Sequence, residues 1–138
     1  MADKLILIDL NIVLDVLQKR APYYEASANL LAAVETGRVN GYLAAHSITT
    51  LFYLIKKDRS IADAKALITN LLQFIKVAPV DQTTIEQALN LNYPDFEDAV
   101  QMMSAVQCKV NCLVTRNIKD YQPALLPVMQ PVEYLATL

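Results

Sequence analysis

Acidic and amide side chains stand at three places in this chain where apolar runs end or helices begin, and these residues could do chemistry. Asp9 directly follows a short apolar run, and Asn117 follows another such run by two residues. Asp95 and Asp98 are three residues apart, so they share a face if this segment is helical. Carboxylates transfer protons and bind hard cations, so either chemistry is open to such a group.

The composition leaves few other side chains that could catalyse a reaction. The chain has 138 residues, with 12 basic and 14 acidic side chains and a net charge of −2. Its two glycines, Gly37 and Gly41, cannot form a glycine-rich loop that binds phosphate groups. One histidine and two cysteines exclude a zinc site of paired histidines or of four thiolates, and Cys108 and Cys112 are expected to be small buried hydrophobic residues. If the protein is an enzyme, carboxylates are its expected agents.

Apolar runs that alternate with helical patterns predict the elements that must position these residues. Strands are expected at 4–8, 41–45, 76–80 and 112–115, with an edge strand at 127–130. Helical patterns fill the first three intervals between strands, and Pro131 begins a last helix. This order predicts an α/β fold in which a parallel sheet lies between helices, formed by a single domain over residues 1–138.

Several details of these helices follow from the same patterns. Ser47 and Ser60 are expected to cap the two helices between the second and third strands. The second of these helices carries an apolar stripe that is expected to be buried and includes Ile61, Ala64, Ile68 and Leu72. The helix from Asp95 to Gln107 is expected to bury Phe96, Ala99, Val100 and Met103.

The predicted strands bring the candidate residues to one edge of the sheet, because ligands of open parallel sheets bind outside the carboxyl ends of the strands. The residues expected there are Asp9, Asn11, His46, Ser47, Thr50, Asp95, Asp98, Arg116 and Asn117. Each also has a purely structural explanation, as a helix cap, a partner of the helix dipole or a turn residue, and His46 is given no role. Their common location favours one cleft that contains Asp9, Asp98 and Asn117.

Four segments, in this order, resemble the PIN-domain family. LILIDLNIVLDVL, from Leu5, resembles the family's first strand and helix, with the strand ending in Asp-x-Asn. AHSITTLFYLIKK (45–57) resembles the segment that normally brings a Glu or Asp, and DFEDAVQMMSA (95–105) resembles the central acidic helix. LVTRNIKDY (113–121) resembles the segment after the fourth strand, which usually reads Thr-x-Asp and then Asp-Phe or Asp-Tyr. The similarity is to the small prokaryotic branch related to VapC-type toxins of toxin–antitoxin systems.

The resemblance implies a three-layer α/β/α PIN-like fold with a short central parallel sheet, and a ribonuclease that depends on Mg²⁺ or Mn²⁺. Family members hold one or two ions with three or four acids, and the ions activate water against an RNA phosphodiester. Carried over to this chain, the metal ligands are Asp9, Asp98 and Asp95, and the catalytic residues are Asp9, Asp98 and Asn117. Residues in supporting roles are Asn11, Thr50, Thr115 and Asp120.

Two positions depart from the family pattern. Thr50 stands where a Glu or Asp is usual, and Asn117 stands where the fourth strand is normally followed by an acid. Two divalent ions carry four positive charges, whereas the two firmly matched acids, Asp9 and Asp98, carry two negative ones. We therefore expect at most one weakly held ion.

The substitutions at Thr50 and Asn117 leave a second function open, in which the fold binds RNA or protein without cutting. A phospho-acceptor signalling domain is disfavoured, because it would need paired acids near the first strand and a lysine after the last. For the nuclease, Arg116 and Lys119 are the candidate RNA contacts, with Lys109, Lys56 and Lys57 as further ones; all could equally be solvated surface.

The resemblance also implies partners. RNA, an antitoxin protein and a second copy of the chain, forming a homodimer, are the expected ones. No apolar stretch approaches the ~20 residues of a membrane-spanning helix, and Asp9, Asn11 and Asp15 interrupt the apolar run near the N-terminus, which argues against a signal peptide. A cytoplasmic location is therefore expected.

Overall fold

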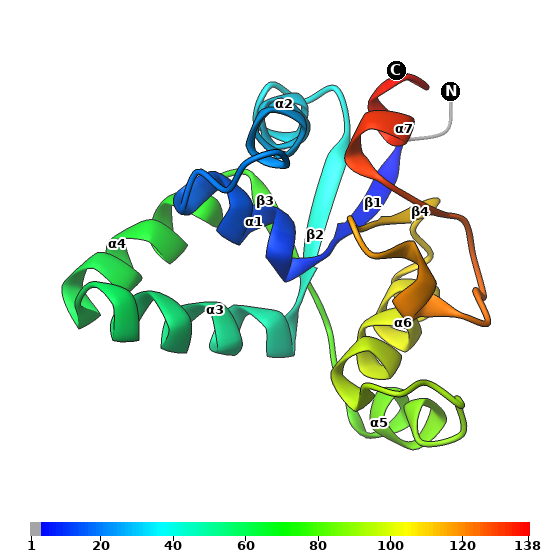
Figure 1. Cartoon of the computed structure of the whole chain (residues 1–138). Coiled ribbons are helices and arrows are strands. Elements are labelled where there is room, and N and C mark those ends of the chain that lie inside the picture. Colours follow the sequence, from blue (N-terminus) through cyan, green and yellow to red (C-terminus); the bar gives the residue numbers. More distant parts are fainter. Residues whose placement is uncertain (1–3) are drawn as a thin grey trace.

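The strands form a single parallel sheet in the computed structural model, which describes residues 4–138 (Figure 1). They are β1 (Leu5–Ile8), β2 (Asn40–Ala44), β3 (Ile75–Ala78), β4 (Cys112–Val114) and β5 (Val128–Met129), and their spatial order is β3-β2-β1-β4-β5. Every neighbouring pair is parallel. The predicted α/β fold with a short parallel sheet is confirmed, and β5 is the edge strand that the sequence predicts.

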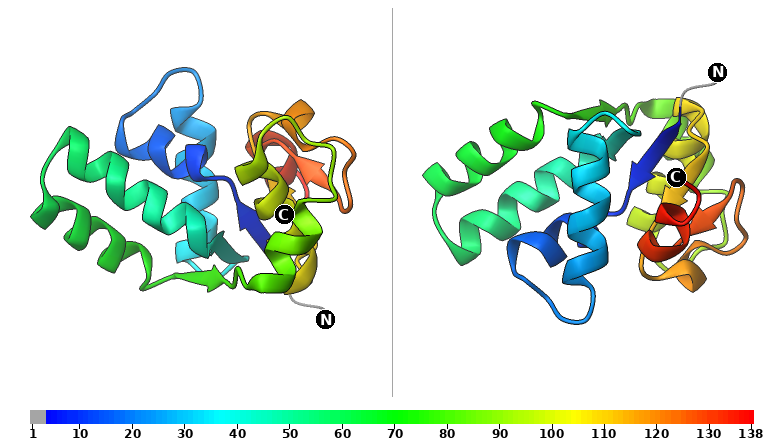
Figure 2. Two further views of the ribbon diagram at one scale, coloured as in Figure 1. Left: turned by 90° about the horizontal axis from the view of Figure 1, so that it is seen from below. Right: turned by 90° about the horizontal axis from the view of Figure 1, so that it is seen from above.

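Helices cover both faces of the sheet, as the two views of Figure 2 show. They are α1 (Leu10–Leu17), α2 (Tyr24–Glu35), α3 (Ala45–Asp58), α4 (Ile61–Leu71), α5 (Gln82–Ala88), α6 (Phe96–Cys108) and α7 (Pro131–Leu135), with a short 3₁₀ helix at Ile118–Tyr121. Successive side chains of a strand point to opposite faces. Accordingly, Ile6 and Ile8 pack with residues of α1, α2, α3 and α7, whereas Leu7 packs against Met102 of α6.

Three of the expected helix details are wrong. Ser47 does not cap α3, because that helix begins at Ala45 and buries Ser47. Phe96 is 45% exposed, although Ala99, Val100 and Met103 of the same helix are buried as predicted. In α4 the expected stripe is only partly covered: Ala64 is buried and Ile68 is half-buried against the core, whereas Ile61 and Leu72 are exposed. The reason is that α4 packs mainly on α3, so that only a narrow part of its surface is covered.

The expected cap at Ser60 is confirmed, since its side chain accepts a hydrogen bond from the backbone N–H of Asp63. Gly37 follows α2 with a φ of +82°, as a residue that ends a helix in the left-handed region should. No helix within residues 4–138 is long and apolar enough to cross a membrane.

The strand order fixes where the candidate residues meet. From β1 the chain passes to β2 and β3 on one side and then returns to β4 and β5 on the other, so the direction of winding changes at β1. Open α/β sheets bind ligands at such a point, outside the carboxyl ends of the strands. Asp9, Ala45 and Thr115 directly follow β1, β2 and β4, and the backbone N–H of Asp9 bonds to the carbonyl oxygen of Val114 at 3.0 Å.

Candidate active site

Asp9 accepts three hydrogen bonds at this edge of the sheet, and it is only 6% exposed. Its Oδ1 accepts a hydrogen bond from the backbone N–H of Asn11 at 3.0 Å, which caps α1. Its Oδ2 accepts bonds from the hydroxyl of Thr115 at 2.8 Å and from the hydroxyl of Tyr121 at 3.1 Å. The structural role and the site role of Asp9 therefore coexist, one on each oxygen.

Tyr121 joins Asp9 to Asp98. Its side chain is buried, and its hydroxyl lies 3.1 Å from Oδ2 of Asp9 and 3.2 Å from Oδ1 of Asp98. Burial, together with the charges of both carboxylates, raises the pKa of Tyr121, so the phenol keeps its proton. The two acids that the sequence singles out are thus brought together, with one hydroxyl between them.

Two polar side chains orient the hydroxyl of Tyr121 through hydrogen bonds. The side-chain amide of Gln101 donates to the oxygen of Tyr121, and the hydroxyl of Ser47 donates to the amide oxygen of Gln101 at 3.0 Å. Because Ser47 occupies the amide oxygen, the NH₂ group of Gln101 is directed at Tyr121. All three side chains are buried.

The acids open into a cleft of about 140 Å³ that is lined by Asp9, Leu10, Asn11, His46, Ser47, Asp95, Glu97, Asp98 and Gln101. Among these described lining residues, none is Lys or Arg. Burial, then the charges of Asp95 and Asp9, raise the pKa of Asp98 to about 7. The cleft therefore holds more negative charge than its own side chains can balance.

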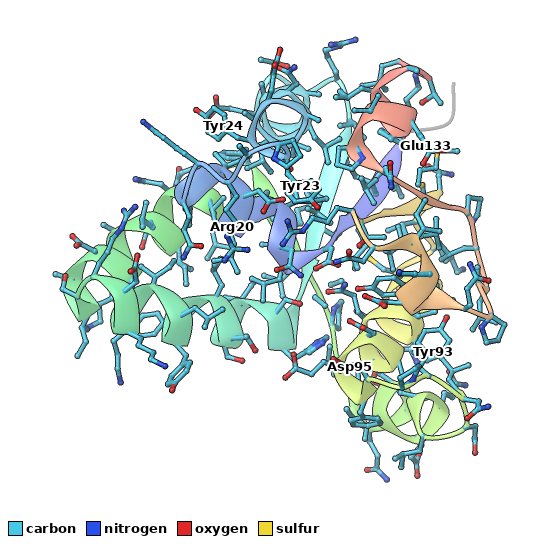
Figure 3. All side chains as sticks on the ribbon, viewed as in Figure 1. Arg20, Tyr23, Tyr24, Tyr93, Asp95 and Glu133 are labelled. Atoms are coloured by element: carbon cyan, nitrogen blue, oxygen red, sulfur yellow. The ribbon has the colours of Figure 1, made fainter. Side chains whose placement is uncertain are left out.

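Asp95 lines the cleft, but its carboxylate is partly engaged. Its Oδ1 accepts the backbone N–H of Glu97 at 2.8 Å and so caps α6; Figure 3 shows Asp95 where the chain enters this helix. Within residues 4–138, no three His, Cys, Asp or Glu side chains are arranged to hold a metal ion. One pair of carboxylates with surplus negative charge and amide oxygens nearby does suit a single hard cation that takes further ligands from water or substrate.

Several other expected site residues do not line this cleft, among them Thr50, Asn117 and Asp120. The hydroxyl of Thr50 donates to the carbonyl oxygen of His46, one turn earlier in α3. Asn117 lines a separate hollow beside Arg116 and Lys119, and its backbone N–H donates to the hydroxyl of Thr115. Asp120 is exposed, but its charge is close enough to contribute to the raised pKa of Asp98.

Arg116, expected to contact RNA, has a partner inside the protein. Its guanidinium lies 3.4 Å from Oδ1 of Asp15 and 4.2 Å from the centre of the Tyr23 ring. Asp15 is fully buried, and burial raises its pKa, against the lowering effects of Arg116 and Arg20. Figure 3 shows Arg20 and Tyr23 at the corner between α1 and α2. Much of Arg116 is thus committed to holding this corner to the segment after β4.

Tyr121 and Gln101 were missed as site residues by the sequence interpretation, and Ser47 was expected at this edge of the sheet without a role in the site. Two of them carried a usable signal: Gln101 is three residues after Asp98, on the same face of α6, and Tyr121 follows Asp120 in the motif after the fourth strand. The hydrogen bond from Ser47 to Gln101 had no such signal in the sequence, because the expected place of Ser47 at the helix N-terminus pointed to capping instead.

Comparisons with known proteins agree with this architecture. A toxin–antitoxin complex from Klebsiella pneumoniae matches with a TM-score of 0.69 at 20% identity, over 91% of this chain and 97% of that one. VapBC-1 from nontypeable Haemophilus influenzae matches with a TM-score of 0.69 at 13% identity, over 93% and 98%. VapC20 from Mycobacterium tuberculosis, a toxin that cleaves the sarcin–ricin loop, matches with a TM-score of 0.62 at 15% identity, over 78% and 86%.

No curated protein matches the chain in sequence. The sequence does match the family model of the PIN domain, over residues 5–119, which is most of its length. The chain therefore belongs to the PIN-domain family.

Proposed function

We propose that this protein is a metal-dependent ribonuclease that acts on RNA in the cytoplasm as the toxin of a toxin–antitoxin pair. The observation that carries the proposal is the Asp9–Asp98 pair, bridged by Tyr121 in a cleft whose described lining residues include no Lys or Arg. Such a pair of carboxylates needs a cation to balance its negative charge. A phosphodiester is also an anion, so it can approach the pair only when that cation is bound.

Asp9 and Asp98 would hold one Mg²⁺ or Mn²⁺, with Asp95 beside them and Asn117 near the substrate. When bound, the ion supplies a water of lowered pKa and neutralises charge on the phosphate. The chain itself orients the ligands: Thr115 and Tyr121 fix Oδ2 of Asp9, and the N–H of Asn11 fixes Oδ1. Asn11 and Gln101 offer uncharged polar groups to the rest of the cleft.

The test is RNA cleavage with added Mn²⁺ or Mg²⁺. Asp9→Asn and Asp98→Asn should each lower the rate by at least about 100-fold, a loss typical of a group that acts in the chemical step. Glu86→Gln removes an exposed acid of α5 and should leave the rate unchanged. Equal residual activity in the native chain and both cleft variants would mean that a contaminant cuts the RNA.

A second candidate is a binding module with this fold and an impaired metal site. It is favoured by the absence of a three-ligand cluster in residues 4–138 and by Thr50 and Asn117 at positions that are usually acidic. The double variant Thr50→Asp/Asn117→Asp discriminates between the two. If it gains metal affinity and cleavage that the native chain lacks, the native protein is the binding module.

The proposed partners are an antitoxin protein and a second copy of this chain. Support for the antitoxin comes from the structural neighbours, which include a toxin–antitoxin complex and VapBC-1. Co-expression with the product of the adjacent reading frame, followed by purification and mass measurement, tests both. A complex with a short protein that has a DNA-binding N-terminus would support the toxin assignment.

A further inference from the structure

The solvent-facing side of α3 connects the cleft to a pair of lysines. His46 lines the cleft from the first turn of this helix, and Lys56 and Lys57 are exposed in its last turn. Between them lies Tyr53, which is 56% exposed. Residues three, four or seven positions apart share a helix face, so these side chains form one stripe together with Thr49. We call His46, Thr49, Tyr53, Lys56 and Lys57 the α3 stripe.

Thr49, Tyr53, Lys56 and Lys57 are exposed in the described part of the chain, whereas His46 is half-buried and its Nε2 lies 3.2 Å from the carbonyl oxygen of Glu97 in α6. Leu51 and Ile55, on the opposite side of α3, are buried in the core, and the helix packs on α1, α4 and β2. Figure 1 shows the outer side of α3 without an element beyond it, and the view from below in Figure 2 agrees. At 1.5 Å per residue, the stripe runs about 16 Å from His46 to Lys57, which a strand of a few nucleotides can span.

The charge at the far end of the stripe is positive, because Lys56, Lys57 and Arg59 outnumber the exposed Asp58, and it is reinforced from α1. The guanidinium of Arg59 donates to the carbonyl oxygen of Leu17 at 3.2 Å, which brings the end of α1 and its exposed Lys19 next to the end of α3. The helix dipole alone would favour lysines in the last turn of α3. It does not account for Tyr53, a large aromatic side chain left open to solvent in the same stripe.

Exposed lysines with an aromatic side chain between them suit single-stranded nucleic acid, because phosphates pair with the charges and a base stacks on the ring. Resting on the proposed ribonuclease function, we propose that the α3 stripe binds the single-stranded RNA that leaves the cleft. One base stacks on Tyr53, and the phosphates on its far side contact Lys56 and Lys57.

The experiment measures binding of a labelled single-stranded RNA by fluorescence anisotropy in EDTA, so that no cleavage occurs. Tyr53→Ala should weaken binding on the order of tenfold, as expected for the loss of one stacked base, and Tyr53→Phe should bind like the native chain. Lys56→Gln/Lys57→Gln should weaken binding and reduce the slope of log affinity against log salt by about 1.4, or about 0.7 for each lost phosphate contact.

The matched control is Lys4→Gln/Lys76→Gln, which removes two exposed lysines that do not line the cleft, one before β1 and one in the edge strand β3. This variant should bind RNA like the native chain. Where cleavage is measurable, the stripe variants should raise KM for a long RNA and leave kcat unchanged, because they do not touch the cleft.

The outcomes separate the two proposals. Cleavage that depends on Asp9, with stripe variants that bind and cut like the native chain, would overturn the stripe and leave the nuclease standing. RNA binding that depends on the stripe, without any cleavage, would support the stripe and overturn the nuclease. The stripe is also refuted if the native chain does not bind single-stranded RNA, or if Tyr53→Ala converts a dimer to a monomer in sedimentation, which would make the stripe an interface between copies.

Discussion

At the scale of single residues, the protons shared by Tyr121 and the two carboxyl groups determine how the negative charge of the cleft is balanced. Its oxygen accepts from Gln101, and it has one proton to give to either of two carboxylates. Asp9 already accepts two other bonds, whereas burial and the nearby charges raise the pKa of Asp98 to about 7. The arrangement is satisfied when Tyr121 donates to Asp9 and a protonated Asp98 donates to Tyr121.

Tyr121→Phe tests this bridge. The substitution keeps the ring but leaves the Gln101 amide without its acceptor, Asp9 without one of its donors and the Asp98 carboxyl without its partner, which should cost about 1–2 kcal/mol of unfolding free energy. Added Mn²⁺ should restore more stability to the variant than to the native chain, because a cation replaces the missing donor. Urea unfolding with and without Mn²⁺ measures both effects.

Tyr93→Phe is the matched control, since Tyr93 meets the Tyr121 ring edge-on at 6.4 Å but bonds through its hydroxyl to the carbonyl of Pro123. Its stability should respond to Mn²⁺ as the native chain does. An identical response of the Tyr121→Phe variant would show that the hydroxyl does not mediate between the acids.

Asp98→Asn should change how stability depends on pH. The pKa of Asp98 rises from an ordinary value of 3.8 to about 7 on folding, so the folded state binds this proton more tightly than the unfolded state. The resulting stabilisation is complete below pH 4 and is lost as the pH rises through 7. At pH 8 the uncharged variant should exceed the native chain by about 1–3 kcal/mol in unfolding free energy, since Asp98 is only partly buried.

Thermal or urea unfolding at pH 4 and pH 8, without metal, measures this difference, with Glu86→Gln as the exposed control. The gap between Asp98→Asn and the native chain should open only at the higher pH. A gap of equal size at both values would mean that Asp98 ionises in the folded protein as it does in the unfolded chain.

The residues of the cleft were predictable from sequence where a strand end or a helix spacing located them. Asp9 follows β1, and Asp98 lies in the first turn of α6, so both positions follow from local pattern. The hydrogen bonds that connect these residues do not follow from local pattern, because Tyr121 contacts Asp9 across 112 residues of chain and Ser47 contacts Gln101 across 54. Such contacts depend on how strands pair, which no local periodicity encodes.

At the scale of elements, the ion pair between the partly exposed Arg116 and the buried Asp15 connects the segment after β4 to α1. Arg116→Ala should destabilise the fold by about 3–5 kcal/mol, because it leaves the buried Asp15 carboxylate with little compensation. Arg20→Ala should cost at most about 1 kcal/mol, because its guanidinium is 3.8 Å from Asp15 and its side chain is 35% exposed. Urea unfolding measures both.

Asp15→Asn/Arg116→Met removes both charges and should recover most of the loss, since the cost comes from the unpaired charge. If Arg116→Ala unfolds like the native chain but binds RNA more weakly, the sequence-based expectation of an RNA contact is correct and the ion pair contributes little.

Helices and strands were predicted well where their sequence pattern was strong. The burial of their side chains was predicted less well, because it depends on which neighbouring element covers them. The five strands and the helices between them follow from apolar runs and breaks at Pro and Gly. The burial of Phe96 and of the α4 stripe was overestimated, because apolar spacing shows which face can be buried and not whether another element covers it. α4 has mainly α3 as its neighbour.

At the scale of the whole molecule, a net charge of −2 conceals an uneven distribution. From Val77 to Cys108 the chain has five acids and no Lys or Arg: Asp81, Glu86, Asp95, Glu97 and Asp98. The ends of α1 and α3 carry a surplus of positive charge, with Lys19, Lys56, Lys57 and Arg59 against Asp58. An anionic strand is therefore attracted at one end of α3 and repelled at the other, unless a cation occupies the cleft.

A cation that binds only the folded chain must also stabilise it, and this gives the last prediction. Mn²⁺ at 100 times its dissociation constant should raise the unfolding free energy by about 2.7 kcal/mol, and excess EDTA should reverse the effect. Asp9→Asn and Asp98→Asn should each abolish the increase, whatever their stability without metal, because each removes one of only two well-placed carboxylates. Titration should saturate at one ion per chain; an increase that survives in both variants would place the ion elsewhere in the molecule.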